Sequence, residues 1–142
     1  MNGFLLDTNI PSELMRPAPE PKVQGWLAAQ DIGVLFLSVV SIGEMEAGLA
    51  TLQDASRRAR LEASLARHLA HLFEGRVLPV TQSIAVRWGR LDGVRRMAGR
   101  PLSASDGMIA ATALEHGLAL VTRNVRDFAD LGLEVINPWM GQ

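Results

Sequence analysis

Three acidic residues stand where they could bind a metal ion. Asp7 directly follows the apolar run 3–6, and Glu44 and Asp106 lie near the expected starts of two helices. Asn124 and Asp127 follow a later apolar run, so acids or amides come from four segments. Carboxylate oxygens are preferred ligands of Mg²⁺ and Mn²⁺. An ion held by them can activate a water and neutralise charge on a phosphate. The pattern is therefore compatible with metal-assisted hydrolysis of a phosphodiester.

Each of these acids also has a structural interpretation. Asp7 could cap the helix that follows it. Glu44 and Asp106 each stand three residues after a serine, which is the spacing of a capping box. Asp127 could be an ordinary turn residue. Spacing alone does not establish that the segments meet in space.

Alternating apolar strands and helical patterns predict how these acids are positioned. Interleaved strands and helices favour an α/β fold with a mostly parallel sheet covered on both faces, whose ligands gather at the carboxyl ends of the strands. Strands are expected at 3–6, 33–37, 77–80, 118–122 and 133–136, with 77–80 at an edge or strand end because of Pro79. Helices are expected after Asp7 as far as Pro17, around 23–27, from Ser41, at 55–73 and 82–97, and from Ser103 to Gly117.

Length and composition set further bounds. The 142 residues, 48% of them apolar, suit one domain spanning 1–142. With no cysteine, a metal must sit on oxygen or imidazole ligands. His68 and His71 could share a helix face and bind zinc, but two solvated surface histidines are the simpler interpretation. We expect neither a signal peptide nor a membrane span, and hence a cytoplasmic location.

Arginine dominates the basic residues, although the net charge is only −1. Guanidinium groups bind phosphate through two parallel hydrogen bonds, so an arginine-rich segment could hold a nucleic acid backbone. An ordinary solvated helix face is the alternative. The candidates are Arg87, Arg90, Arg95, Arg96 and Arg100, followed by Arg123 and Arg126, and a second cluster comprises Arg57, Arg58 and Arg60.

Four segments together resemble the PIN-domain nucleases, and within them the VapC and FitB-like toxins of bacterial toxin–antitoxin pairs. In chain order they are FLLDTNIPSELMRP, SVVSIGEMEAGL, LSASDGMIAATALEHGLALVTRNVRDF and VINPW. The resemblance implies an α/β/α sandwich with a central, mostly parallel sheet of four to five strands. It also implies an Mg²⁺- or Mn²⁺-dependent endoribonuclease.

The resemblance maps the family's site onto this chain. Its three acids correspond to Asp7, Glu44 and Asp106, which would hold the metal directly or through waters, and one of them would accept a proton from the attacking water. Thr8 and Asn9 continue the first motif, and Thr122 could hydrogen-bond an acid or a bound water. The chain departs at Asn124, where many relatives have an aspartate. Asp127 could partly replace that acid, and whether one or two ions bind stays open.

Partners follow only from the resemblance. Such toxins form homodimers and bind a small antitoxin, which has a DNA-binding end and a tail that covers the toxin's groove. Operator DNA is then bound through the antitoxin. One alternative is a binding module that keeps the fold, lacks useful catalysis and acts with its antitoxin on operator DNA. Another is a metal-dependent phosphatase or a flap-type nuclease that acts on DNA.

Overall fold

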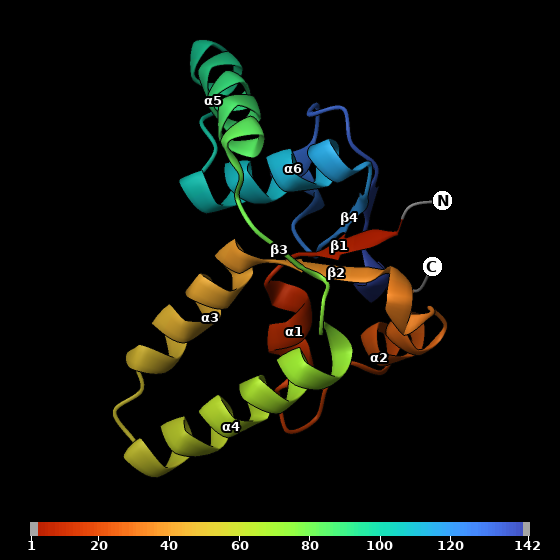
Figure 1. The fold of residues 1–142 in the computed structure, drawn as a ribbon, viewed down its shortest axis with the longest axis vertical. Helices are drawn as coiled ribbons and strands as arrows, with labels where there is room; N and C mark the ends of the chain where they lie inside the picture. Colours follow the sequence, from red (N-terminus) through yellow and green to blue (C-terminus); the bar gives the residue numbers. More distant parts are fainter. Residues whose placement is uncertain (1–2, 141–142) are drawn as a thin grey trace.

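The computed structural model describes residues 3–140, whose five strands form one parallel sheet (Figure 1). The spatial order is β3-β2-β1-β4-β5. Every neighbouring pair is parallel, as predicted. The short β3 lies at an edge, in agreement with the proline that follows it. The strands are β1 Phe4–Leu6, β2 Leu35–Ser38, β3 Val77–Leu78, β4 Ala119–Val121 and β5 Val135–Ile136.

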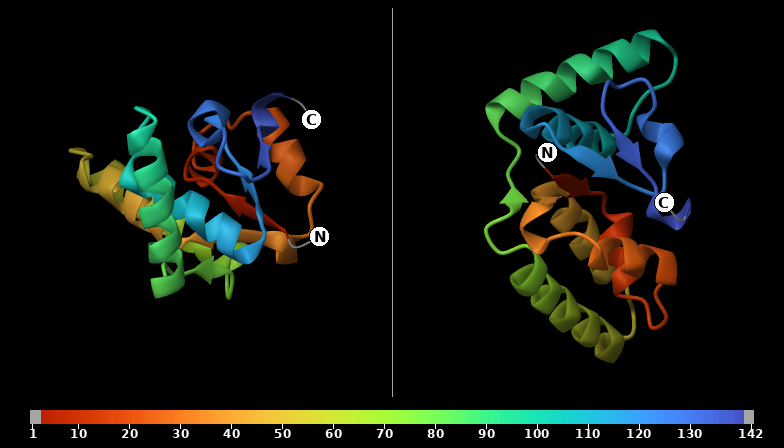
Figure 2. Two further views of the ribbon diagram at one scale, coloured as in Figure 1. Left: turned by 90° about the horizontal axis from the view of Figure 1, so that it is seen from above. Right: turned by 90° about the vertical axis from the view of Figure 1, so that its right-hand side faces the viewer.

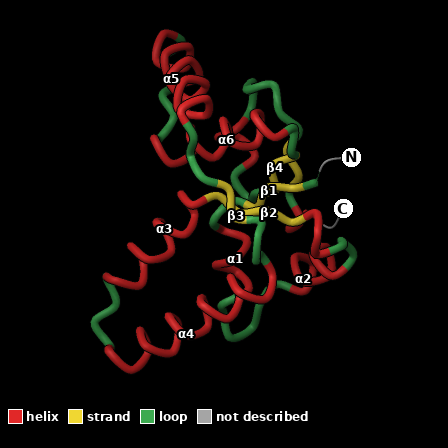
Figure 3. Tube along the Cα trace, viewed as in Figure 1, coloured by secondary structure: helices red, strands yellow, loops and turns green. Residues whose placement is uncertain are grey.

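Helices cover both faces of this sheet, which confirms the predicted α/β/α sandwich. Figure 1 shows α5 and α6 on one side of the sheet and α1, α3 and α4 on the other, and Figure 3 shows how short the strands are beside the helices. Figure 2 shows the same layers from two further sides. The helices are α1 Asn9–Leu14, α2 Pro21–Ala28, α3 Val39–Ala50, α4 Ala55–Leu72, α5 Gln82–Met97 and α6 Ala104–His116.

Successive residues of β1 point to opposite faces and enter two separate cores. Leu5 packs with Ile109 and Leu120 beneath α6, whereas Leu6 packs with Leu37 and Val121 beneath α1 and its neighbours. All of these side chains are essentially inaccessible to solvent. A strand buried on both faces reads as a continuous apolar run, which is why it was recognisable in the sequence.

The start of α3 differs from its prediction. The helix begins at Val39, not Ser41, and its cap is Ser38, whose Oγ accepts a hydrogen bond of 3.0 Å from the Val40 backbone N–H. Because β2 runs directly into α3, the last residue of the strand caps the helix. Ser41 is therefore buried within the helix, and the predicted capping box with Glu44 is wrong.

The start of α6 agrees with its prediction. The Ser103 Oγ accepts a hydrogen bond of 3.1 Å from the Asp106 backbone N–H, and Gly117 ends the helix in the left-handed region at φ 64°. This cap holds the Asp106 backbone in the first turn of α6, at the carboxyl-end edge of the sheet. Within residues 3–140, no helix combines the length and apolar character needed to cross a membrane.

Close packing of α5 against α6 depends on Gly107, the residue after Asp106. A Cβ atom at this position would lie 2.4 Å from Trp88 Cδ1 and 2.6 Å from Trp88 Nε1. Trp88 belongs to α5, so any side chain at position 107 must displace the indole or separate the two helices.

We expect Gly107→Ala to lower the free energy of unfolding by about 1–2 kcal/mol, because the overpacking cost exceeds the gain in helix propensity. Urea denaturation measures the change. Gly93→Ala is the matched control, since that α5 glycine has no atom within 4 Å of the added methyl group and should gain stability. Equal effects of the two substitutions would contradict the packing argument.

Candidate active site

Asp7 is a buried carboxylate at the carboxyl end of β1. It is 4% exposed, and its Oδ2 accepts a hydrogen bond of 2.7 Å from the Thr122 hydroxyl. Its Oδ1 accepts a hydrogen bond of 2.8 Å from the Thr8 backbone N–H, and Asn9 Nδ2 lies 3.5 Å from Oδ2. The pairing of Leu6 with Val121 places Asp7 beside Thr122 on the neighbouring strand. The Thr122 hydroxyl therefore orients the Asp7 carboxylate; the sequence allowed it to bond either an acid or a bound water, and the structure has the first of these contacts.

Glu44 reaches the same region from α3. The Thr8 hydroxyl donates a hydrogen bond of 2.5 Å to Glu44 Oε1 and lies 2.9 Å from Ser41 Oγ. Thr8 is the N-cap residue of α1, but its side chain makes no capping hydrogen bond. Its hydroxyl joins the first acidic motif to the second. Sequence reasoning assigned Ser41 to capping and missed this contact, because the pairing of residues 8 and 41 becomes visible only when β1 and β2 are placed side by side.

Asp106 completes a group of mutually repelling acids. Burial, followed by the charges of Asp7, Asp127 and Glu44, raises the pKa of Asp106 from its ordinary value of 3.8 to about 6. Burial also raises the pKa of Asp7, with smaller contributions from Glu44 and Asp127. Glu44 thus lies close enough to Asp7 and Asp106 to raise the pKa of both, and Asp7 lies close enough to raise that of Asp106.

The fit of these acids to a divalent cation can be judged from their chemistry and arrangement. Among residues 3–140, no three carboxylate or imidazole side chains are grouped closely enough to hold one ion. An ion at this edge would therefore complete its shell with water, which Mg²⁺ retains readily. The oxygen-only donor set and the mutual repulsion of the acids both suit a hard dication.

The raised pKa of Asp106 predicts how stability changes with pH. The folded protein holds the proton on the Asp106 carboxyl more tightly than the unfolded chain does. The contribution of this proton to the free energy of unfolding is therefore full below about pH 4 and is lost as pH rises through about 6. Asp7 acts in the same direction. We expect the metal-free protein to lose on the order of 1–2 kcal/mol over this range, allowing for solvent screening. Urea titrations of the original protein and of Asp106→Asn at several pH values measure this loss. If the free energy of unfolding changed with pH equally in the two proteins, the role of Asp106 would be contradicted.

Asn124 and Asp127 lie on the turn that follows β4. The Asn124 backbone N–H donates a hydrogen bond of 3.0 Å to Thr122 Oγ1. The Asn124 side chain makes no hydrogen bond within residues 3–140. Asp127 is exposed on the short 3₁₀ helix Val125–Phe128, and its charge raises the pKa of both Asp7 and Asp106. Of the two residues, Asp127 adds negative charge to the site.

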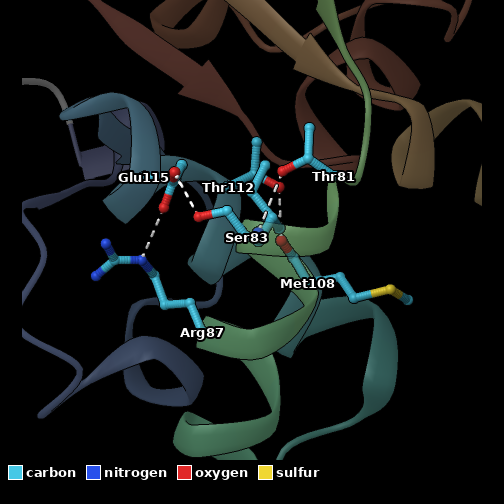
Figure 4. Close-up of polar contacts among 7 residues, drawn as sticks. Thr81, Ser83, Arg87, Met108, Thr112 and Glu115 are labelled. Atoms are coloured by element: carbon cyan, nitrogen blue, oxygen red, sulfur yellow. Dashed lines mark hydrogen bonds and ion pairs between the residues drawn. The ribbon is translucent and has the colours of Figure 1, made fainter.

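The arginines predicted to bind RNA fall into three groups. Arg87, Arg96 and Arg100 form ion pairs with Glu115, Asp92 and Asp130 at 3.3, 2.9 and 3.3 Å. Figure 4 shows Arg87 beside Glu115, which also accepts a hydrogen bond from Ser83. Arg90, Arg123 and Arg126 have no carboxylate partner among residues 3–140.

Arg95 corrects the prediction for the third group. It is 6% exposed, and its guanidinium donates to the backbone carbonyls of Arg100, Asp127 and Ala129 at 3.2, 2.9 and 3.2 Å. Because α5 packs along the turn after β4, this side chain lies inside the protein and ties that turn to α5. It is not available to an RNA phosphate.

The comparisons with known proteins agree with the fold. The model of the PIN domain family matches residues 4–133. Toxin FitB of Neisseria gonorrhoeae is 34% identical over 136 residues, covering 96% of this chain and 98% of that protein. VapC ribonuclease Y4jK of Sinorhizobium fredii is 36% identical, with coverage of 96% and 97%. The solved structure of FitAB bound to an IR36 DNA fragment matches with a TM-score of 0.87 at 33% identity, covering 96% and 95%.

Fold, site and sequence thus define one class, and this chain belongs to the PIN domain family. Within that family it is similar to proteins named as a toxin and as a VapC ribonuclease.

Proposed function

We propose that this protein is the toxin of a toxin–antitoxin pair and an Mg²⁺- or Mn²⁺-dependent endoribonuclease. The observation that supports this most directly is the group formed by Asp7, Glu44 and Asp106 at the carboxyl-end edge of the sheet, where burial and the charge of Glu44 raise the pKa of Asp7, and burial and the charges of Asp7 and Glu44 raise the pKa of Asp106. A FitB-named toxin and a VapC-named ribonuclease align with nearly the whole chain, which supports both parts of the proposal.

The chain's own residues would orient the reaction. Thr122 and the Thr8 backbone N–H hold the two oxygens of Asp7, and the Thr8 hydroxyl holds Glu44. Two of the acids Asp7, Glu44 and Asp106 would bind the ion directly and the third would reach it through a water, with Asp127 adding charge and Asn124 able to bind a coordinated water. A bound divalent cation would supply an activated water and stabilise negative charge on the scissile phosphate. The fixed carboxylates would keep that water in line with the phosphorus.

RNA would be held by guanidinium groups near these acids. Arg126 lies on the short 3₁₀ helix after β4 and forms no ion pair within the described part of the chain. Arg90, on α5, is also without a carboxylate partner there. Arg87, Arg96 and Arg100 would have to exchange their acid partners for phosphate. RNA affinity should fall as salt increases, because phosphate contacts release counterions.

The partner would be a small antitoxin whose tail covers a groove next to the acids. This groove has a volume of about 650 Å³ and is bordered by Thr8 and Glu44 at one end. Its walls include apolar side chains from α3, from α4 and from the residues that follow α1 and α3, which suit the apolar face of a docked peptide. They are Met15, Met45, Leu49, Leu52 and Leu61. The proposed state of the free toxin is a homodimer.

The proposal is tested by incubating the purified protein with labelled single-stranded RNA, single-stranded DNA and branched DNA. We expect cleavage of RNA with Mg²⁺ or Mn²⁺ and none with EDTA. Cleavage of either DNA in preference to RNA would support the alternative of a DNA-directed nuclease, and release of phosphate alone would support a phosphatase.

A second candidate is a catalytically weak module that binds operator DNA together with its antitoxin. The match to FitAB bound to a DNA fragment favours a DNA-associated role, and the uncharged Asn124 favours weak catalysis. Expression in growing cells separates the two candidates. A nuclease should arrest growth, and Asp7→Asn should abolish the arrest; equal growth with both proteins would favour the binding module.

A further inference from the structure

Arg123 lies over the ring of Trp139, and this stacked pair borders a small pocket. The Arg123 guanidinium carbon is 5.2 Å from the indole centroid. Arg123 is exposed and forms no ion pair within residues 3–140. The indole therefore supports a planar cation whose outer side remains available for a further stacking partner.

Hydrogen bonds connect this pair to the site. Arg123 follows Thr122, which donates to Asp7. The Arg123 backbone N–H donates a hydrogen bond of 3.4 Å to Asn9 Oδ1, and Asn9 Nδ2 lies 3.5 Å from Asp7 Oδ2. Asn137 Nδ2 lies 3.5 Å from the Arg123 carbonyl oxygen. These contacts fix the backbone of Arg123 one residue away from the support of the first acid.

The other end of the pair is held equally closely. The Trp139 backbone N–H donates a hydrogen bond of 2.9 Å to Asn137 Oδ1. One asparagine side chain therefore links the two stacked residues. Trp139 is half-buried and packs against the core cluster beneath α1. The ring is thus a fixed platform, and the orientation of the guanidinium is set by it.

The pocket beside this pair has nearly balanced charge. Its volume is about 190 Å³, and it is lined by Glu13, Arg16, Glu20, Arg123 and Trp139 with two prolines and an alanine. Buried Glu13 is held by Arg16 at 3.2 Å and by the Glu20 backbone N–H at 2.9 Å. Two acids oppose two arginines, so the pocket has little net attraction for a phosphate. A flat neutral group with hydrogen-bonding edges suits it better.

We propose that the Arg123–Trp139 pair is a base-stacking subsite, which holds an unpaired nucleobase of the RNA next to the scissile phosphate. This inference rests on the proposed function for the identity of the substrate. Single-stranded RNA is recognised by stacking of splayed bases on aromatic rings and guanidinium planes. Arg123 is then a positioning residue that sets which nucleotide lies at the acids.

Affinity measurements on four variants test the subsite. The probe is a fluorescent single-stranded RNA 12-mer of mixed sequence, bound in EDTA so that no cleavage occurs. We expect Arg123→Met and Trp139→Leu to weaken binding about tenfold, the scale of one lost stacking contact. Arg123→Lys should weaken it nearly as much, because lysine keeps the charge and loses the plane. Trp139→Phe, which keeps a ring, should bind within about twofold of the original protein.

An abasic 12-mer with the same ribose-phosphate backbone is the decisive control. Arg123→Lys should bind it as well as the original protein does, because the charge is retained and no base is present to stack. Equal losses of Arg123→Lys on both RNAs, or its full affinity for the RNA that carries bases, would overturn the subsite in favour of a simple phosphate contact. Thermal melts confirm that each variant is folded. Because binding is measured without divalent cations, this result is independent of metal-dependent cleavage, whose absence would overturn only the proposed function.

Discussion

Asp7→Asn should reduce the rate of RNA cleavage at least about 100-fold, which corresponds to about 2.7 kcal/mol of lost transition-state stabilisation. The substitution keeps the size of the side chain and removes its charge. Because Asp7 is the most buried of the acids, no neighbouring carboxylate can take its position. Single-turnover cleavage of labelled RNA in Mg²⁺ measures the effect.

The same substitution should have the opposite effect on stability. Burial raises the pKa of Asp7, so its ionised form destabilises the metal-free fold at neutral pH. We expect the metal-free Asp7→Asn protein to melt at pH 8 at a temperature no lower than that of the original protein.

Asp54→Asn is the matched control for both measurements. Asp54 caps α4 by accepting a hydrogen bond from the Arg57 backbone N–H, and asparagine caps a helix equally well. Cleavage and stability should therefore be unchanged. Full cleavage by Asp7→Asn would contradict the role of Asp7, and a large loss of stability would contradict the electrostatic argument.

Thr122→Val should lower cleavage about 10- to 100-fold, the usual effect of removing a group that orients a metal-binding carboxylate. The Thr122 hydroxyl donates a hydrogen bond of 2.7 Å to Asp7 Oδ2, and valine keeps the shape of the side chain while removing the donor. Losing this bond should raise the pKa of Asp7 further, because the Thr122 bond lowers it. The pH at which cleavage reaches half of its maximum should then move upward, which a pH–rate profile measures.

Thr112→Val is the control, because Thr112 is as deeply buried as Thr122 but lies on α6 away from the acids. Its hydroxyl donates a hydrogen bond of 2.7 Å to the Met108 backbone carbonyl within the helix (Figure 4). The two variants should lose similar stability, and only Thr122→Val should lose activity. A similar loss of cleavage in both would show that the effect comes from folding and not from the hydrogen bond.

The fold was predictable because its strands are local apolar runs. β1 and β4 are buried on both faces, so Leu5 and Leu120 belong to runs without polar interruption. The bounds of α5, Gln82–Met97, agree with the predicted range of 82–97. The start of α3 was misplaced, because Ser38 and Ser41 are both acceptable caps and only the end of β2 decides between them.

The site was predictable in part. The identities of Asp7, Glu44 and Asp106 followed from motifs, whereas the contact between Thr8 and Glu44 depends on a separation of 36 residues in sequence. Exposure could not be inferred for the arginines: Arg95 and Arg96 are neighbours in sequence, yet Arg95 is buried and Arg96 is exposed. Trp139 was part of a recognised motif, but its stacking on Arg123 depends on how β4 and β5 are paired.

Titration with Mn²⁺ is the most direct test of a shared cation site, and paramagnetic resonance of the free ion reports binding without any RNA. The original protein should show saturable binding that releases protons near pH 6, where Asp106 is partly protonated. Asp7→Asn should weaken that binding at least about tenfold, the scale expected when one member of a metal site is lost. Equal Mn²⁺ affinity in the two proteins, or no saturable binding in either, would contradict the proposal that these acids hold a metal ion.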